Sequence, residues 1–360
     1  MITTISPSSP SLTAPTIWVL GSVIRAFLKN IEVSKSFDLN VNIEHTGHNL
    51  VLTHALERCV TLTVRNEEEP WRGAISANTL LKLINTDSAR SVAISRDGIR
   101  HFQAGQWWDI PMQEFDPGVE ERNRTYNTLD KAIWTEAFVE KMREAQRFQS
   151  DDDTRAILNG VAVQGEHLIA TDGRVMLVSP RNNSMLSTPI IVGNIPKLLG
   201  NTLVRIGNSD PEDKIPTHIQ WQFWVEKAAI AITDKLVYGN YPNWKQVMPE
   251  PPEDPVNVVL PDKFGDILKL AKGEKHIRLF NEGETVMGQL PLQPPFPITG
   301  CHWFGEEGQK WQVAFDPKFA VKAVKAGFRS IEIKDEFSPM RWKRLPDDGD
   351  LVVLMPMRVS

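Results

Sequence analysis

The chain has 360 residues, of which 41% are hydrophobic, and a formal net charge of −5. This length suits two or three domains with ordinary cores, and charges interrupt every apolar run before it reaches membrane-spanning length. Proteins that hold nucleic acid tightly through its phosphates are usually basic, so the net charge argues mildly against DNA binding. A protein that gathers its positive charge on one surface stays possible.

The N-terminal segment and the cysteines bear on location. Residues 1–15 lack the basic start and the continuous apolar stretch of a secretory signal, so we expect a short disordered leader. Cys59 and Cys301 lie far apart in the sequence, which argues against a disulfide framework and fits a reducing cytoplasm.

The first third of the chain predicts two helices and intervening strands. A first helix is predicted from apolar residues at helical spacing: Ile17, Leu20, Ile24, Phe27 and Leu28. Strands are expected near Leu50–Thr53 and Val60–Val64, and a second helix near Asn78–Asn85. A proline-rich break at 111–117 ends this part, because proline neither continues a helix nor donates to a sheet.

The middle third repeats this order. Its first helix is predicted from one apolar stripe: Trp134, Phe138, Met142, Ala145 and Phe148. Residues 155–180 predict strands that turn at Gly165-Glu166 and at Thr171-Asp172-Gly173, with Ile157 on the face of the first strand. A short second helix is expected near Pro196–Leu199, and a second proline-rich break follows at 249–255.

The last third again predicts a pair of helices. Their apolar stripes are Phe264, Ile267, Leu268 and Ala271, and then Phe319, Ala320, Ala323 and Val324. Helix pairs with sheets occur three times, which indicates an internal structural repeat of α+β segments. We therefore predict three domains, at 1–125, 126–249 and 250–360.

Basic side chains lie opposite the apolar stripes on nearly every predicted helix. They are Arg25, Lys29, Lys82, Arg143, Arg147, Lys197, Lys269, Lys318, Lys322 and Lys325. If the helices line one concave surface, these side chains would meet DNA phosphates without reading bases. Exposed helix faces are commonly charged, however, and Glu136, Glu140 and Glu144 fit that simpler explanation.

Two clusters suggest metal chemistry. The first contains His45, His48, His54 and Cys59. Its spacing matches no familiar zinc pattern, and residues 44–54 predict a hairpin instead, so no metal site is expected there. The acidic run Asp151–Asp153 supports the alternative function, a metal-dependent hydrolase that processes nucleic acid, although a solvated loop explains the run better.

Three segments together resemble one protein family. They are LNG followed by ATDGR (158–174), YGNYPNWKQVMP (238–249) and the ending DLVVLMPMRVS (350–360). In this order they resemble bacterial sliding clamps, the β subunits of DNA polymerase III. A weaker resemblance covers most of the chain, including SANTLLKLINT (76–86) and FDPKFAVKAVKAG (315–327). The chain resembles a divergent or phage-type member.

The resemblance implies a clamp fold of three domains, each with two helices packed on β-sheets, and a ring formed by a head-to-tail homodimer. It implies a non-catalytic processivity factor without metal or cofactor, located in the cytoplasm with the nucleoid and not in a membrane. The ring would encircle duplex DNA independently of sequence. Its partners would be DNA polymerase and an ATP-driven clamp loader, held through short peptide motifs.

The resemblance also implies a pocket for those peptides, which would insert a motif of the type Gln-Leu-x-Leu-Phe. Its residues are Leu158, Thr171, Gly173, Arg174, Val175, Met176, Pro242, Gln246, Val247, Val353, Met355, Pro356, Met357 and Arg358. The chain departs from the family at Arg174-Val175, where His-Arg is usual, and at Gln246, where Arg is usual. Alternatively, the two methionines of the tail finish a core strand, but Pro356 would interrupt its ladder.

Overall fold

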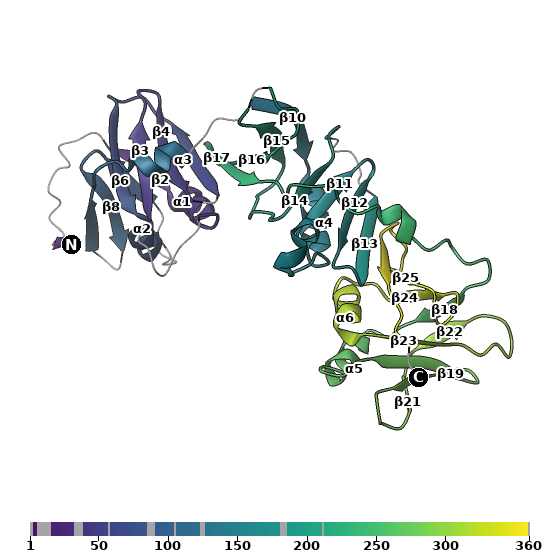
Figure 1. Cartoon of the computed structure of the whole chain (residues 1–360). Coiled ribbons are helices and arrows are strands. Elements are labelled where there is room, and N and C mark those ends of the chain that lie inside the picture. Colours follow the sequence, from purple (N-terminus) through teal and green to yellow (C-terminus); the bar gives the residue numbers. More distant parts are fainter. Residues whose placement is uncertain are drawn as a thin grey trace. The chain divides into compact units, whose positions relative to one another are not determined.

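A computed structural model of the chain describes these residues: 3–5, 16–31, 39–56, 58–84, 91–103, 106–122, 127–180, 186–210 and 212–358. The chain divides into two compact units. Figure 1 labels their helices and strands. Unit 1 comprises Met1–Glu136, Ser184–Leu186 and Pro196–Leu236. Unit 2 comprises Ala137–Asn183, Ser187–Ile195 and Val237–Ser360. Among the described residues, no helix is long and apolar enough to cross a membrane.

Unit 1 contains two antiparallel sheets. The five-stranded sheet has the order β1 (Thr3–Ile5), β9 (Gln106–Pro111), β8 (Gly98–Gln103), β7 (Ser91–Ser95) and β2 (Ile17–Leu20). The eight-stranded sheet has the order β10 (Asn127–Trp134), β15 (Thr202–Asn208), β16 (His218–Val225), β17 (Ala228–Lys235), β5 (Cys59–Arg65), β4 (Asn49–Ala55), β3 (Asn40–His45) and β6 (Trp71–Ser76). Its helices are α1 (Gly21–Leu28), α2 (Ala77–Ile84) and α3 (Pro117–Arg122).

The eight-stranded sheet joins two predicted domains. Strand β17 pairs with β5, so that Ala228 lies opposite Val64. Buried tryptophans complete the core of unit 1, where Trp134 and Trp221 meet edge to face with ring centroids 5.2 Å apart. The hairpin of β3 and β4 confirms the prediction for residues 44–54.

Unit 2 contains a nine-stranded and a four-stranded sheet. The first has the order β14 (Ile190–Val192), β11 (Val161–Gln164), β12 (His167–Thr171), β13 (Val175–Pro180), β26 (Leu351–Leu354), β25 (Met340–Lys343), β24 (Ser330–Ile333), β18 (Val256–Val259) and β22 (His302–Phe304). The second has the order β21 (Phe296–Pro297), β20 (Thr285–Gln289), β19 (Ile277–Glu282) and β23 (Gln312–Phe315). Its helices are α4 (Glu136–Gln146), α5 (Phe264–Leu270), α6 (Pro317–Lys325) and the 3-10 turns η1 (Asp153–Leu158) and η2 (Trp244–Val247).

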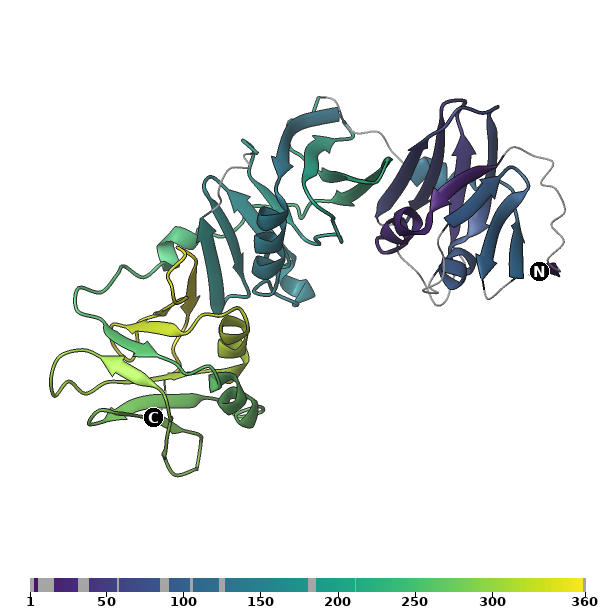
Figure 2. The ribbon, with the colours of Figure 1, turned by 180° about the vertical axis from the view of Figure 1, so that it is seen from behind.

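Helices α5 and α6 lie side by side in unit 2, as Figure 2 shows from behind. The sequence sets the start of α6, because Asp316 accepts a hydrogen bond from the amide of Lys318 at 2.8 Å and Pro317 occupies the first turn. Ala320 and Ala323 are fully buried, so the basic residues of this helix are restricted to its other faces.

Two predicted helices are corrected by the structure. Ile17 and Leu20 belong to strand β2, and α1 begins only at Gly21. Burial along β2 alternates with a period of two, and the apparent helical spacing arose from joining this period to that of α1. Residues 196–199 form no helix; Asn30 accepts a hydrogen bond from the amide of Lys197 and donates one to its carbonyl, at 2.8 and 3.0 Å.

The middle helix is shorter than its apolar stripe. Trp134 ends β10 and Phe148 follows α4, although both side chains are fully buried. Ile157 lies in η1 rather than in a strand. The two predicted turns of residues 161–180 are confirmed by the pairing of β11 with β12 and of β12 with β13.

Candidate functional site

The turn between β12 and β13 fixes its own shape. The Oδ1 atom of Asp172 accepts hydrogen bonds from the amides of Arg174 and Val175, at 3.0 and 3.1 Å. The Thr171 hydroxyl donates to the Val175 carbonyl at 2.8 Å and accepts from the Gly173 amide at 3.0 Å. Gly173 has a φ of 91°, which glycine adopts without steric cost. We call residues 171–175 the docking turn.

Two segments that are distant in sequence form hydrogen bonds with the docking turn. The Tyr241 hydroxyl accepts a hydrogen bond from the Thr171 amide at 3.1 Å. The Tyr241 hydroxyl is neutral at physiological pH, as that of an ordinary tyrosine is, and burial raises its pKa further. At the other end, the Met355 amide donates to the Arg174 carbonyl at 3.0 Å. The turn, the segment 238–249 and the C-terminal tail therefore meet, as the three sequence motifs predicted.

Two cations also reach Asp172, whose side chain is 9% exposed. An Nη atom of Arg155 donates to the Asp172 carbonyl at 3.0 Å. The ammonium of Lys322, on α6, lies 2.7 Å from Asp172 Oδ2. Reasoning from the sequence missed both contacts and also the role of Tyr241. A tyrosine inside a YP motif was the available signal, since a buried hydroxyl needs a partner.

An apolar cluster lies beneath the turn. It comprises Leu158, Ala162, Ile169, Met176, Val178, Ile191, Tyr241, Trp244, Leu351 and Val353. Met176 of β13 lies opposite Val353 of β26, which brings two of the predicted pocket segments into direct register. The floor of the predicted pocket is thus part of a packed core.

The other predicted pocket residues differ in exposure. Val247 is 56% exposed and Met355 is 42% exposed, and the remaining exposed members are Gly173, Arg174, Pro242, Gln246 and Arg358. Exposed apolar side chains beside a buried apolar floor suit the binding of an apolar peptide. Val175 is buried and directly precedes Met176 in β13, so its side chain lies on the opposite face of the sheet from that of Met176.

The end of the tail makes different contacts. After β26, Pro356 stands outside the strand, so the tail does not continue the ladder. The Met357 amide donates to the Ala314 carbonyl of β23 at 2.7 Å, and the guanidinium of Arg358 lies 5.6 Å from the centroid of the Phe337 ring. Both contacts anchor the tail to the part of unit 2 that follows residue 250.

The predicted DNA-facing residues are mostly at the surface of their own units. Those classed as exposed are Lys29, Lys82, Arg147, Lys197, Lys269, Lys318 and Lys325, whereas Arg25, Arg143 and Lys322 are half-buried. Lys269, Lys318 and Lys325 line a hollow of about 910 Å³ between α5 and α6. Some of these charges are already paired within the chain, as Lys269 is with Asp266 at 2.8 Å and Arg143 with Glu140.

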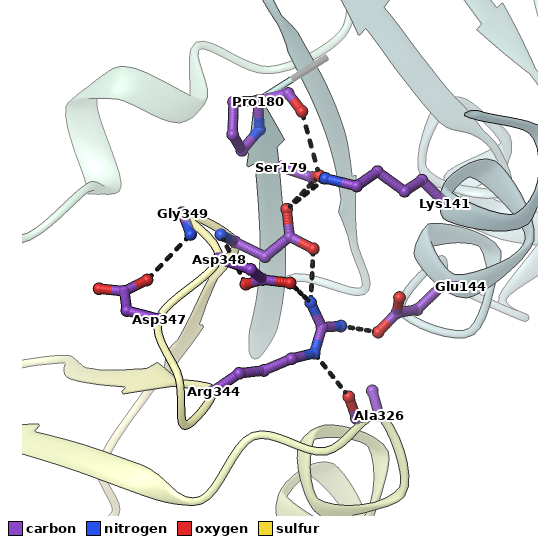
Figure 3. Close-up of polar contacts among 10 residues, drawn as sticks. Lys141, Glu144, Ser179, Pro180, Ala326, Arg344, Asp347, Asp348 and Gly349 are labelled. Atoms are coloured by element: carbon purple, nitrogen blue, oxygen red, sulfur yellow. Dashed lines mark hydrogen bonds and ion pairs between the residues drawn. The ribbon is translucent and has the colours of Figure 1, made fainter. Parts of the chain in front are cut away.

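A cluster around Arg344, which we call the arginine hub, joins α4 and β13 to the last part of the chain (Figure 3). The guanidinium binds Asp350 at 2.6 Å and Asp348 at 2.5 Å, pairs with Glu144 of α4, and donates to the Ala326 carbonyl at 2.9 Å. It also lies 4.2 Å from the centroid of the Phe328 ring.

Asp350 is the most buried acid of the hub, at 2% exposure. It accepts a hydrogen bond from the Ser179 hydroxyl and lies 3.3 Å from the ammonium of Lys141. Burial is the largest influence on the pKa of Glu144 and raises it, and the negative charge of Asp350 raises it further, whereas Arg344 lowers it.

The candidate metal ligands have other roles. Asp152 caps η1 by accepting from the amide and hydroxyl of Thr154, at 3.0 and 2.6 Å, and pairs with Arg155. Among the described residues, no group of three or more His, Cys, Asp or Glu side chains is arranged to hold a metal ion. The geometry therefore gives no support to the hydrolase alternative.

No protein-family model and no curated protein matches the sequence. Solved structures do match. The β subunit of DNA polymerase from Streptococcus pyogenes superposes with a TM-score of 0.75 at 13% identity, over 96% of this chain and 100% of that chain. The β subunit of DNA polymerase III from Thermotoga maritima gives a TM-score of 0.73 at 17% identity, with the same coverage.

The β clamp of Helicobacter pylori, solved with a bound DNA ligase peptide, gives a TM-score of 0.68 at 13% identity, over 96% of this chain and 99% of that chain. The chain spans essentially the full length of each of these proteins. It therefore has the sliding-clamp fold, as the sequence motifs predicted.

Proposed function

We propose that this chain is a sliding clamp, a non-catalytic processivity factor that encircles duplex DNA and tethers replication proteins. One observation carries the proposal: in a chain with the sliding-clamp fold, the three motif segments meet at the docking turn. Shared fold alone is weak evidence for function, whereas a specific set of residues meeting at one place is stronger evidence.

The partner-binding pocket would have the apolar cluster as its floor and Val247, Met355 and Pro242 at its rim. A peptide with leucine and phenylalanine anchors would bury those exposed side chains. The clamp of Helicobacter pylori was solved with a peptide from DNA ligase, which supports peptide docking as the mode of binding. DNA polymerase and a clamp loader would use this pocket in turn.

The ring itself would be a head-to-tail homodimer with three domains in each subunit, at 1–125, 126–249 and 250–360. Closing a ring from two copies satisfies sheet edges that a monomer leaves open. The exposed basic residues of the helices would face the DNA and bind phosphates independently of sequence. Such a protein would work in the cytoplasm, at the nucleoid.

The oligomeric mass and topological binding to DNA test the ring together. Light scattering at micromolar concentration should give twice the mass of the chain. With a clamp loader and ATP supplied, the protein should stay on nicked circular DNA and leave after the circle is cut. A monomeric mass, or equal retention on linear and circular DNA, would refute the ring.

Removal of the tail tests the pocket separately. Deleting residues 355–360 removes the exposed Met355 and its bond to the docking turn, so we expect loss of peptide binding. The dimer should persist, since the proposed pocket does not take part in ring closure. Unchanged affinity for a fluorescent Gln-Leu-Ser-Leu-Phe peptide would refute the pocket.

A further inference from the structure

We infer that Lys322 is a positioning residue of the partner-binding pocket and not part of the DNA-facing surface, an inference that rests on the proposed function. The spacing of Lys318, Lys322 and Lys325 on α6 suggests one basic row. The structure separates them. Lys318 and Lys325 are exposed, whereas the Lys322 side chain is 24% exposed and ends against the docking turn.

The ammonium of Lys322 already has partners within the chain. Its ammonium lies 2.7 Å from Asp172 Oδ2 and 3.5 Å from the Gln149 carbonyl oxygen. To bind a phosphate it would have to leave a carboxylate that is nearly buried. An unpaired buried carboxylate costs more free energy than one exposed phosphate contact returns.

Asp172 connects Lys322 to the backbone of the docking turn, and thereby to the pocket. One carboxylate oxygen faces Lys322 and the other accepts from the amides of Arg174 and Val175. Without the cation, the carboxylate would turn toward water and release those two amides. The carbonyl of Arg174, which holds Met355, belongs to the same turn, so the rim of the pocket would shift.

Peptide affinity provides the first test, with matched variants on one helix. Lys322→Met should weaken binding of a fluorescent Gln-Leu-Ser-Leu-Phe peptide about five- to thirtyfold, as expected for one lost charged hydrogen bond. Lys318→Met and Lys325→Met should change it less than about twofold, since exposed side chains away from a site have small effects. Lys322→Arg, which keeps the charge, should restore most of the affinity. Wild-type affinity in Lys322→Met would overturn the inference.

Retention on circular DNA should show the opposite ranking. Lys318→Met and Lys325→Met should each shorten the residence time of rings already loaded on the circle, because each removes an exposed cation. Lys322→Met should leave this residence time unchanged, even where weaker binding of the loader lowers the number of rings loaded. If Lys322→Met instead shortened retention and bound peptide normally, Lys322 would belong to the DNA-facing surface after all.

Amide hydrogen exchange separates this inference from the proposed function. Lys322→Met should speed exchange in the docking turn at 171–175, whereas Lys318→Met should not. If the wild type bound no peptide but the exchange changed in this way, the proposed function would fail and the positioning contact would stand. Unchanged exchange would refute the contact even if the wild type bound the peptide.

Discussion

In unit 2, the part of the chain before residue 250 contacts the part after it at two junctions, the docking turn and the arginine hub. Different interactions hold the two junctions. The docking turn is held mainly by hydrogen bonds between side chains and backbone groups, together with the ion pair of Asp172 and Lys322. Several carboxylates surround one guanidinium at the hub, and Asp350 there is 2% exposed.

This difference indicates that the hub mainly stabilises the fold and that the docking turn mainly serves partner binding. Apolar side chains stay exposed near the docking turn, at Val247 and Met355, which suits a surface that awaits a partner. The hub buries Asp350 and leaves Arg344 only 18% exposed, which suits a junction that must stay closed. We therefore expect changes at the hub to alter mainly unfolding, and changes at the turn to alter mainly peptide binding.

The largest expected effect is that of Arg344→Met. Removing the guanidinium leaves Asp350 and Glu144 without their shared partner, which should lower the free energy of unfolding by about 3–5 kcal/mol. Urea denaturation measures this. Arg147→Met, at an exposed arginine just after α4, is the control and should cost less than about 0.5 kcal/mol.

The same variant also tests the comparison. The folded fraction of Arg344→Met should bind the peptide within about twofold of the wild type, because distant sites act independently. If peptide affinity fell in step with stability, the two junctions would not be separate in function.

Gly173→Ala should have the next largest effect. A Cβ atom there would lie 2.9 Å from an Nη atom of Arg155, in a backbone with a φ of 91°. We expect a loss of about 2–3 kcal/mol in stability, together with weaker peptide binding. Gly165→Ala is the control in the neighbouring turn, where φ is also positive but no atom lies within 4 Å of the new Cβ. It should cost about 1 kcal/mol and spare peptide binding.

Much of this site could be predicted from the sequence, because short motifs name residues that need one another. The strands on either side of the Asp-Gly turn were predicted correctly, and the structure adds that Met176 lies opposite Val353. One prediction failed because two periods follow each other directly. The residues from Ile17 to Leu28 contain a strand and a helix in succession, and their combined spacing resembles one helix.

Contacts between distant side chains could not be predicted. Nothing local distinguishes Lys322 from Lys318 or Lys325, since all three occupy polar positions of the same amphipathic helix. Only the folded chain shows that one of them ends against Asp172. The hub could not be predicted from the sequence either, because Arg344 and Glu144 are 200 positions apart.

A smaller effect is expected from Tyr241→Phe. The variant keeps the ring in the apolar cluster but removes the acceptor of the Thr171 amide, so it should cost about 1–2 kcal/mol. Peptide affinity should fall as well, because the amide belongs to the docking turn. Tyr238→Phe, at a tyrosine that is 80% exposed in the same segment, should change neither quantity. Equal behaviour of the two variants would contradict the role given to Tyr241.

The smallest effect concerns pH at the hub. Burial, together with the negative charge of Asp350, raises the pKa of Glu144 in the folded chain against the attraction of Arg344. Between the pKa of Glu144 in the unfolded chain and its higher pKa in the folded chain, the folded state therefore binds more protons than the unfolded state. The contribution of Glu144 to stability is then present below about pH 4 and falls as pH rises above the pKa of the unfolded chain.

Glu144→Gln removes this dependence. The free energy of unfolding of the variant, minus that of the wild type, should rise between about pH 4 and pH 7. Urea denaturation across this range measures the difference, with Glu140→Gln on the exposed face of the same helix as the control. A difference that fell with rising pH would mean that attraction to Arg344 outweighs burial, and that the hub favours the ionised carboxylate. Peptide affinity should stay constant across the series, because the docking turn does not include Glu144.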